Sequence, residues 1–145
     1  RTAAQLVAEA RRAQAGLRPG DAPLCLLAGG ETTVTIRGSG KGGRNQEMAL
    51  AATLELADDR GIDLICVGTD GTDGPGGFRY PGAPDCLAGA ITDGETAQAA
   101  KQAGIDLEDA LRTHGTSEPL WRLGCGVAAA ANVSALDLRV ILIQE

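Results

Sequence analysis

Apolar residues recur along the chain with two different periods. At residues 2–15, Leu6, Val7 and Ala10 follow the spacing of one helix face, and Gly16 provides a stop signal. This pattern predicts a helix at the beginning of the chain. Further helical patterns cover residues 47–61, 94–103, 107–113 and 117–123.

Four shorter segments have the character of strands. Residues 32–38, TTVTIRG, alternate and are rich in β-branched side chains, which favours a strand. Residues 25–29, 63–68 and 138–143 are almost entirely apolar, as is typical of buried strands. The chain therefore alternates between strands and helices.

This alternation predicts an α/β domain, namely a three-layer α/β/α sandwich with a mainly parallel or mixed sheet. We expect residues 1–145 to form one such domain, with residues 1–23 as a leading helix and loop. In parallel sheets of this kind, ligands bind at the carboxyl ends of the strands. Two glycine-rich loops, at residues 38–43 and 69–77, follow strands at that end, so we expect them to face one site.

Composition limits the kinds of partner. The chain is 43% apolar and carries a net charge of -6, with its basic residues scattered. This argues against nucleic acid or an anionic membrane surface as a partner, and no apolar run approaches the ~20 residues that span a bilayer. The charged N-terminal stretch lacks the apolar segment of a signal peptide. Four widely spaced cysteines and a single histidine indicate reduced thiols in a cytoplasmic protein, without a zinc site.

The loop GSGKGGRNQE, residues 38–47, lies between a predicted strand and a predicted helix. Gly42 and Gly43 let the backbone approach a ligand, and Asn45 can cap the start of the helix. Open backbone amides and the helix dipole attract anions at such a position. Arg44 could bind a carboxylate or phosphate through two hydrogen bonds, and Lys41 could add a point charge. The alternative is a solvated turn with ordinary surface cations.

Two known phosphate-binding patterns can be tested on this loop. The P-loop pattern fails because Gly42 follows Lys41 where serine or threonine is required. The dinucleotide pattern G-x-G-x-x-G matches at Gly38, Gly40 and Gly43. This second match leaves a nicotinamide-dependent oxidoreductase as an alternative function.

Acidic residues accompany both loops. Asp70 and Asp73, in GTDGTDGP, could bind magnesium or could form turns with the neighbouring glycines. Glu31, just after the Gly29-Gly30 turn, is a third candidate. His114 lies near a predicted helix end, where we expect a surface role.

Three segments in this order carry a resemblance to a known family: AGGETTVTIRGSGKGGRNQEMALA, then GTDGTDGPGG, then AGAITDGET. From about Ala28 to the end, the chain resembles the C-terminal domain of the class II glycerate kinases. This domain is also called the MOFRL domain, and some members of the family carry the label hydroxypyruvate reductase. Because the chain begins at Arg1 and enters a helix directly, we expect it to be a piece of a longer protein.

The resemblance implies a function. Members of the family transfer phosphate from ATP, with Mg²⁺, to the 2-hydroxyl of D-glycerate, in a cleft between this domain and a larger N-terminal domain. The family arginine proposed to act in that cleft corresponds to Arg44. The family glutamate corresponds to Glu31, and the two loop aspartates correspond to Asp70 and Asp73. The lysine proposed to act with the arginine belongs to the N-terminal domain.

One segment departs from the family. Residues 125–140 keep Asn132, a further candidate for substrate binding, but have alanines in place of a polar glycine turn. We therefore expect the C-terminal domain of a glycerate 2-kinase-like enzyme that is inactive without its N-terminal domain. A hydroxypyruvate reductase and a non-catalytic domain that binds a small anion remain the alternatives, and a homodimer is left open.

Overall fold

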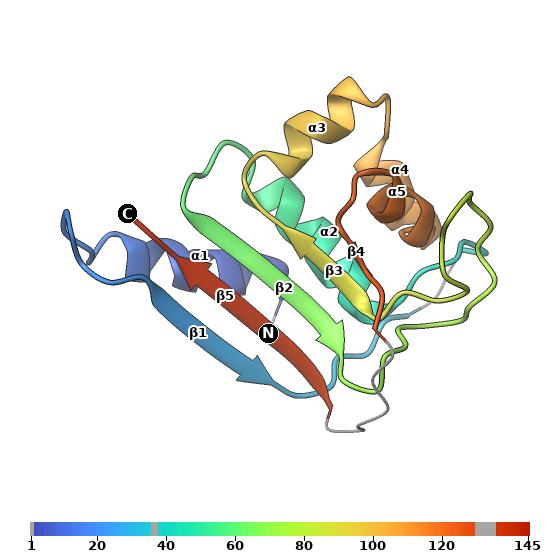
Figure 1. Ribbon diagram of the computed structural model, residues 1–145, viewed down its shortest axis with the longest axis horizontal. Coiled ribbons are helices and arrows are strands. Elements are labelled where there is room, and N and C mark those ends of the chain that lie inside the picture. Colours follow the sequence, from blue (N-terminus) through green and yellow to red (C-terminus); the bar gives the residue numbers. More distant parts are fainter. Residues whose placement is uncertain (1, 36–37, 130–135) are drawn as a thin grey trace.

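The computed structural model describes residues 2–35, 38–129 and 136–145. Its helices are α1 (Ala3–Gln14), α2 (Arg44–Glu55), α3 (Thr96–Gln102), α4 (Leu107–Thr113) and α5 (Ser117–Arg122). Its strands are β1 (Leu24–Gly29), β2 (Ile62–Gly68), β3 (Gly89–Thr92), β4 (Gly126–Val127) and β5 (Asp137–Ile143), as Figure 1 shows. Within these ranges, no helix has both the length and the apolar character needed to cross a membrane.

The strands form one five-stranded sheet in the order β1-β5-β2-β3-β4. Every neighbouring pair is antiparallel, so the prediction of a mainly parallel or mixed sheet is wrong. The last strand, β5, inserts between β1 and β2, and Ile141 pairs with Leu26 on one side and with Leu64 on the other. Local apolar patterns contain no information about such an insertion, because it depends on contacts between distant parts of the chain.

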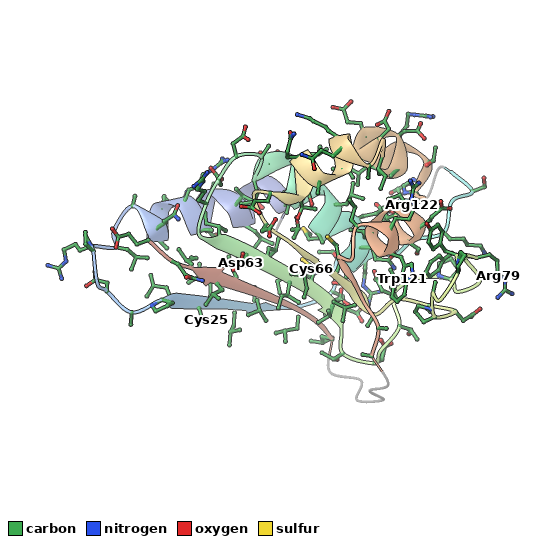
Figure 2. The ribbon with its side chains drawn as sticks, turned by 45° about the horizontal axis from the view of Figure 1, so that its top comes forward. Cys25, Asp63, Cys66, Arg79, Trp121 and Arg122 are labelled. Carbon is green, nitrogen blue, oxygen red and sulfur yellow. The ribbon has the colours of Figure 1, made fainter. Side chains whose placement is uncertain are left out.

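The helices lie on one face of the sheet (Figures 1 and 2). The opposite face carries apolar side chains that remain exposed, among them Leu27 at 69%, Ile91 at 43% and Leu142 at 37%. The third layer of the predicted sandwich is therefore not confirmed. The α/β class itself is confirmed.

The core lies between the sheet and helices α1 and α2. Leu6 and Val7 of α1 are buried there, as their helical spacing predicts, together with Leu50 of α2 and Leu64 of β2. Alanines such as Ala49 allow α2 to pack closely against the sheet. This packing fixes the position of the first turn of α2, which carries Arg44.

Three local points differ from the expectations. In the described part of residues 32–38 there is no strand, because the chain leaves the sheet after β1 and Thr32 turns toward β5 through a hydrogen bond from Arg139. Strand β3 was not predicted, since it is short and its residues Gly-Ala-Ile-Thr give no clear alternation. Helix α2 begins at Arg44 rather than at residue 47.

Candidate functional site

Arg44 is the first residue of α2 and is held from behind by Asp137, the first residue of β5. Its Nε donates to Oδ2 of Asp137 at 2.6 Å, and a terminal nitrogen donates to Oδ1 at 2.9 Å. The Asp137 side chain is fully buried, whereas the Arg44 side chain is 39% exposed. This two-point contact fixes the plane of the guanidinium and leaves part of it accessible to a ligand.

The charges of this pair reinforce each other. Burial works against ionisation of Asp137, but the hydrogen bonds from Arg44 and Asn45 outweigh it and hold the pKa of Asp137 below its ordinary value. The hydrogen bond to Asp137 raises the pKa of Arg44. The guanidinium therefore stays charged at any physiological pH. Asp137 carries no signal in the sequence that marks it as a partner of Arg44, because it lies in the last strand, 93 residues away.

Arg44 and Glu31 line a common cavity of about 300 Å³. A terminal nitrogen of Arg44 lies 3.7 Å from Oε1 of Glu31, whose side chain is 62% exposed. Both glycine-rich loops also line the cavity, through residues that include Gly42, Gly43 and Gly74. The prediction that the two glycine-rich loops face one site is thus borne out by their shared lining of this cavity.

Asp73 caps the start of α2, a role that the sequence had given to Asn45. The Asp73 carboxylate accepts hydrogen bonds from the backbone nitrogens of Asn45 and Gln46 at 3.1 Å and 2.8 Å. The residue at the cap position itself is Gly43, which offers no side chain. Because the amides of Asn45 and Gln46 bind Asp73, these two are not open to a substrate anion.

Asn45 is buried and joins the two carboxylates of the site. Its Nδ2 lies 3.2 Å from Oδ1 of Asp73 and 2.9 Å from Oδ1 of Asp137. Burial raises the pKa of Asp73, although its hydrogen bonds from Gln46 and Asn45 oppose this rise. Asn45 therefore connects the 69–77 loop to the strand that supports Arg44, and it does not line the cavity.

The glycines at residues 42 and 43 serve close packing between loops. A Cβ at Gly42 would lie 2.3 Å from Oγ1 of Thr116, and a Cβ at Gly43 would lie 2.2 Å from the carbonyl oxygen of Asp73. Gly38 and Gly40 of the dinucleotide pattern likewise face the backbone of residues 113–115. These positions need glycine because the neighbouring chain leaves no room, not because a nucleotide approaches them.

The remaining candidates lie apart from the cavity or outside the described residues. Lys41 is exposed, and its carbonyl oxygen accepts a hydrogen bond from the Ser117 nitrogen at 2.9 Å. Asp70 is exposed and its Oδ1 accepts from the Thr72 nitrogen at 3.1 Å, the turn geometry that the sequence left open. Asn132 lies outside the described residues.

A histidine that the sequence placed at the surface lines the cavity as well. Nδ1 of His114 lies 2.8 Å from Oε1 of Glu47, and both side chains are largely buried. His114 ends α4 with a left-handed backbone conformation, φ 58°. The prediction that His114 lies near a helix end is confirmed. The expected surface role is not, because this end of α4 packs against α2.

The described residues do not form a magnesium site from protein side chains alone. Among them, no group of three histidine, cysteine, aspartate or glutamate side chains could hold a metal ion. Asp73 is buried, and its carboxylate oxygens already accept hydrogen bonds from α2. Asp70 is alone on an exposed turn. We therefore derive no catalytic step from a metal held by this part of the chain.

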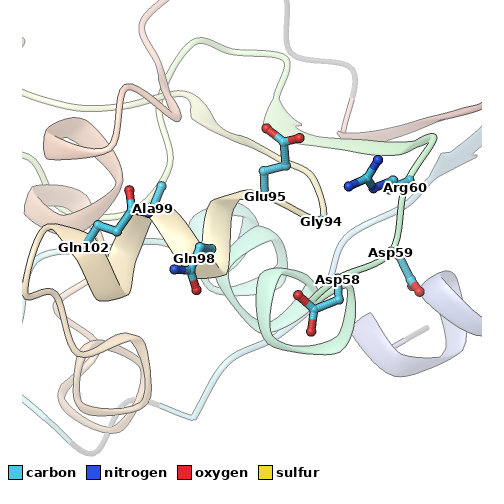
Figure 3. Close-up of a pocket in the computed structure, with 8 residues that line it drawn as sticks. All are labelled: Asp58, Asp59, Arg60, Gly94, Glu95, Gln98, Ala99 and Gln102. Atoms are coloured by element: carbon cyan, nitrogen blue, oxygen red, sulfur yellow. The ribbon is translucent and has the colours of Figure 1, made fainter.

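A larger cavity, of about 450 Å³, lies between the end of α2 and the start of α3 (Figure 3). The carboxylates of Asp58, Asp59 and Glu95 line it, with Arg60 as the one cation among its lining residues. Asp59 already pairs with Arg11 at 2.8 Å. The excess of negative charge disfavours an anionic ligand, so we assign the functional site to the Arg44 cavity.

The fold and the site together define an α/β domain in which a supported, partly exposed arginine lines a small cavity. The MOFRL family model matches residues 24–133, and the chain belongs to this family. That range contains both glycine-rich loops, Arg44 and Glu31, and it ends before Asp137.

Curated relatives carry kinase names. The chain is 44% identical over 108 residues to the glycerate 2-kinase of Pyrococcus horikoshii, covering 74% of this chain and 22% of the relative. It is 41% identical over 107 residues to the D-glycerate 2-kinase of Thermotoga maritima, covering 74% of this chain and 24% of the relative. The chain thus spans about a quarter of the length of these relatives.

A solved structure resembles the whole described fold. The crystal structure of the Thermotoga maritima glycerate kinase superimposes with a TM-score of 0.83 at 35% identity, covering 98% of this chain and 33% of that chain. The likeness extends beyond the range of the family match and includes β5, which carries Asp137.

Proposed function

We propose that this chain is the C-terminal domain of a glycerate 2-kinase-like enzyme, which transfers the γ-phosphate of ATP to the 2-hydroxyl of D-glycerate. The observation that carries the proposal is Arg44, a charged and partly exposed guanidinium that Asp137 holds against a cavity of about 300 Å³. Relatives named glycerate 2-kinase match this part of the chain and support the same activity.

The chemistry of phosphoryl transfer suits such a site. Little covalent participation by the protein is required, and catalysis comes from positioning and from cations placed where charge develops. Arg44 would bind the carboxylate of glycerate or the transferring phosphoryl group. Glu31 would accept a hydrogen bond from a hydroxyl of the bound acid, since its carboxylate lies beside Arg44.

The proposal includes a second domain. The relatives are about four times as long as their match to this chain, which supports an N-terminal domain that supplies the other wall of the cleft. That domain would contribute to the binding of ATP, and Mg²⁺ would accompany the nucleotide phosphates. The isolated 145 residues would then be inactive. A cytoplasmic location and a homodimer remain predictions.

The reductase alternative has lost its main support. The dinucleotide pattern requires a parallel strand–helix–strand unit with an open glycine loop. In the described residues all paired strands are antiparallel, and Gly38, Gly40 and Gly43 pack against neighbouring backbone. A non-catalytic domain that binds a small anion stays as the second candidate function, since Arg44 could bind the anion in that case too.

The decisive experiment uses the full-length protein that contains this chain. With D-glycerate, ATP and Mg²⁺, release of ADP together with 2-phosphoglycerate is expected, and Arg44→Ala should abolish it. Arg18→Ala is the matched control, because Arg18 is an exposed arginine whose contact is the nearby Asp21. A parallel reaction with NADH and hydroxypyruvate tests the reductase. NADH oxidation, or no turnover in either reaction, would contradict the kinase proposal.

A further inference from the structure

Arg139 is a buried guanidinium on β5, on the same face of the strand as Asp137. Only 4% of its surface is exposed. One terminal nitrogen donates to the carbonyl oxygen of Gly30, and the other donates to Oγ1 of Thr32 at 3.0 Å. The second nitrogen also lies 3.4 Å from Oδ2 of Asp137.

These contacts surround one candidate site residue. Gly30 and Thr32 are the two chain neighbours of Glu31, so Arg139 binds the backbone on one side of that residue and a side-chain hydroxyl on the other. The third contact, to Asp137, reaches the residue that orients Arg44. One side chain thus connects the Glu31 segment to the support of Arg44.

Arg139 is a poor choice if fold stability alone is required. Among the described residues its Nε has no hydrogen-bond partner, and the side chain lines a cavity of about 270 Å³ next to Leu6, Ala28 and Gly29. A buried charged donor without an acceptor destabilises a fold. An apolar side chain of similar size would often serve the core equally well. The contacts of its two terminal nitrogens, to Gly30, Thr32 and Asp137, therefore explain better why an arginine occupies this position.

We propose that Arg139 is a positioning residue of the Arg44 site, which fixes the Glu31 segment directly and the orientation of Arg44 through Asp137. This proposal rests on the proposed function for its kinetic consequences, but the clamp itself is a property of the fold. Glycerate and ATP need not contact Arg139.

A double-mutant cycle on the full-length protein tests the kinetic role. Arg139→Met should lower kcat/KM for D-glycerate by about 10- to 100-fold, because small displacements of positioned groups have effects of this size. If Arg139 acts through Glu31, the same substitution should have a much smaller effect in a Glu31→Ala background. Arg139→Lys should recover part of the loss. Equal effects in both backgrounds would refute the direct action on the Glu31 segment, and no effect at all would overturn the proposal as a whole.

Arg11→Met is the matched control for loss of a structural arginine. Arg11 makes the same kinds of contact, to the Asp59 carboxylate at 2.8 Å and to the Glu55 carbonyl oxygen at 2.6 Å, away from the site. It should leave kcat/KM unchanged. If Arg139→Met fails to fold, Thr32→Val removes only the hydroxyl contact and should lower kcat/KM several-fold, while an unchanged value would count against the clamp.

Amide hydrogen exchange separates this inference from the proposed function. Arg139→Met should increase exchange of the Gly30 amide, which donates to the carbonyl oxygen of Asp137 at 3.2 Å, by about 10-fold or more, which corresponds to losing at least 1.4 kcal/mol of local protection. Arg11→Met should not. An inactive wild-type protein would refute the kinase proposal alone, whereas unchanged exchange of the Gly30 amide would refute the clamp whatever the reaction.

Discussion

The most informative single substitution is Asp73→Ala, because Asp73 caps α2 from a separate loop. Its carboxylate accepts hydrogen bonds from the backbone nitrogens of Asn45 and Gln46, and also from the side-chain nitrogen of Asn45. All three residues are buried, so water cannot readily replace the lost acceptor. The substitution should therefore loosen the first turn of α2, which starts with Arg44.

The expected loss in unfolding free energy can be worked from these bonds. Each buried donor left without an acceptor costs about 1–3 kcal/mol, and two backbone donors are involved. Removal of a buried carboxylate, whose pKa is raised by burial, offsets part of this cost. We therefore expect a net loss of about 2–4 kcal/mol in unfolding free energy. This is larger than the ~0.5–2 kcal/mol lost when an ordinary helix cap is removed.

Equilibrium urea unfolding measures this loss, and Asp70→Ala is the matched control. Asp70 belongs to the same loop but is exposed and accepts one hydrogen bond, from the Thr72 nitrogen. Its removal should change the unfolding free energy by at most about 0.5 kcal/mol. A loss below about 1 kcal/mol for Asp73→Ala, less than any two unsatisfied buried donors should cost, would refute the capping argument.

Three further predictions concern the same region and the core. Because the folded pKa of Asp137 lies below its unfolded value of about 3.9, its contribution to stability is present above that pH and is lost as the pH falls through the folded pKa. The difference in unfolding free energy between wild type and Asp137→Asn should therefore shrink below about pH 4, and a difference that stays constant there would contradict the assignment. Gly43→Ala should destabilise by about 1–3 kcal/mol in thermal unfolding, because its Cβ would lie 2.2 Å from the Asp73 carbonyl oxygen, whereas Gly16→Ala, with a contact at 3.4 Å, should be neutral. Burial raises the pKa of Cys66 to about 12, so mass spectrometry after thiol labelling should find exposed Cys25 modified long before Cys66, and equal rates would show that Cys66 is accessible.

The sequence predicted the elements better than their arrangement. Helical spacing at Leu6 and Val7 and the apolar runs of β2 and β5 identify elements that bury one or both faces, and these predictions are confirmed. The insertion of β5 between β1 and β2 could not be predicted, since pairing with distant strands leaves no local pattern. The antiparallel direction of each strand pair likewise depends on how separate parts of the chain meet.

Only part of the candidate site could be predicted, again because contacts between distant residues leave no local pattern in the sequence. Arg44 and Glu31 were selected from glycine-rich segments, whose composition marks unusual local backbone. Asp137 and Arg139 look like ordinary residues of a final strand, and only the folded chain brings Asp137 to 2.6 Å from Arg44. The role of Asp73 as the cap of α2 was not predicted, because a carboxylate in a glycine loop does not indicate which amides it will meet.

The central claim is that Arg44 binds the anionic group of the substrate. Isothermal calorimetry of D-glycerate binding to the full-length protein, compared with Arg44→Ala and with Arg18→Ala as control, tests it most directly. Loss of a charged hydrogen-bonding partner should weaken binding by about 10- to 100-fold for Arg44→Ala and leave the control unchanged. An unchanged dissociation constant for Arg44→Ala would contradict the account.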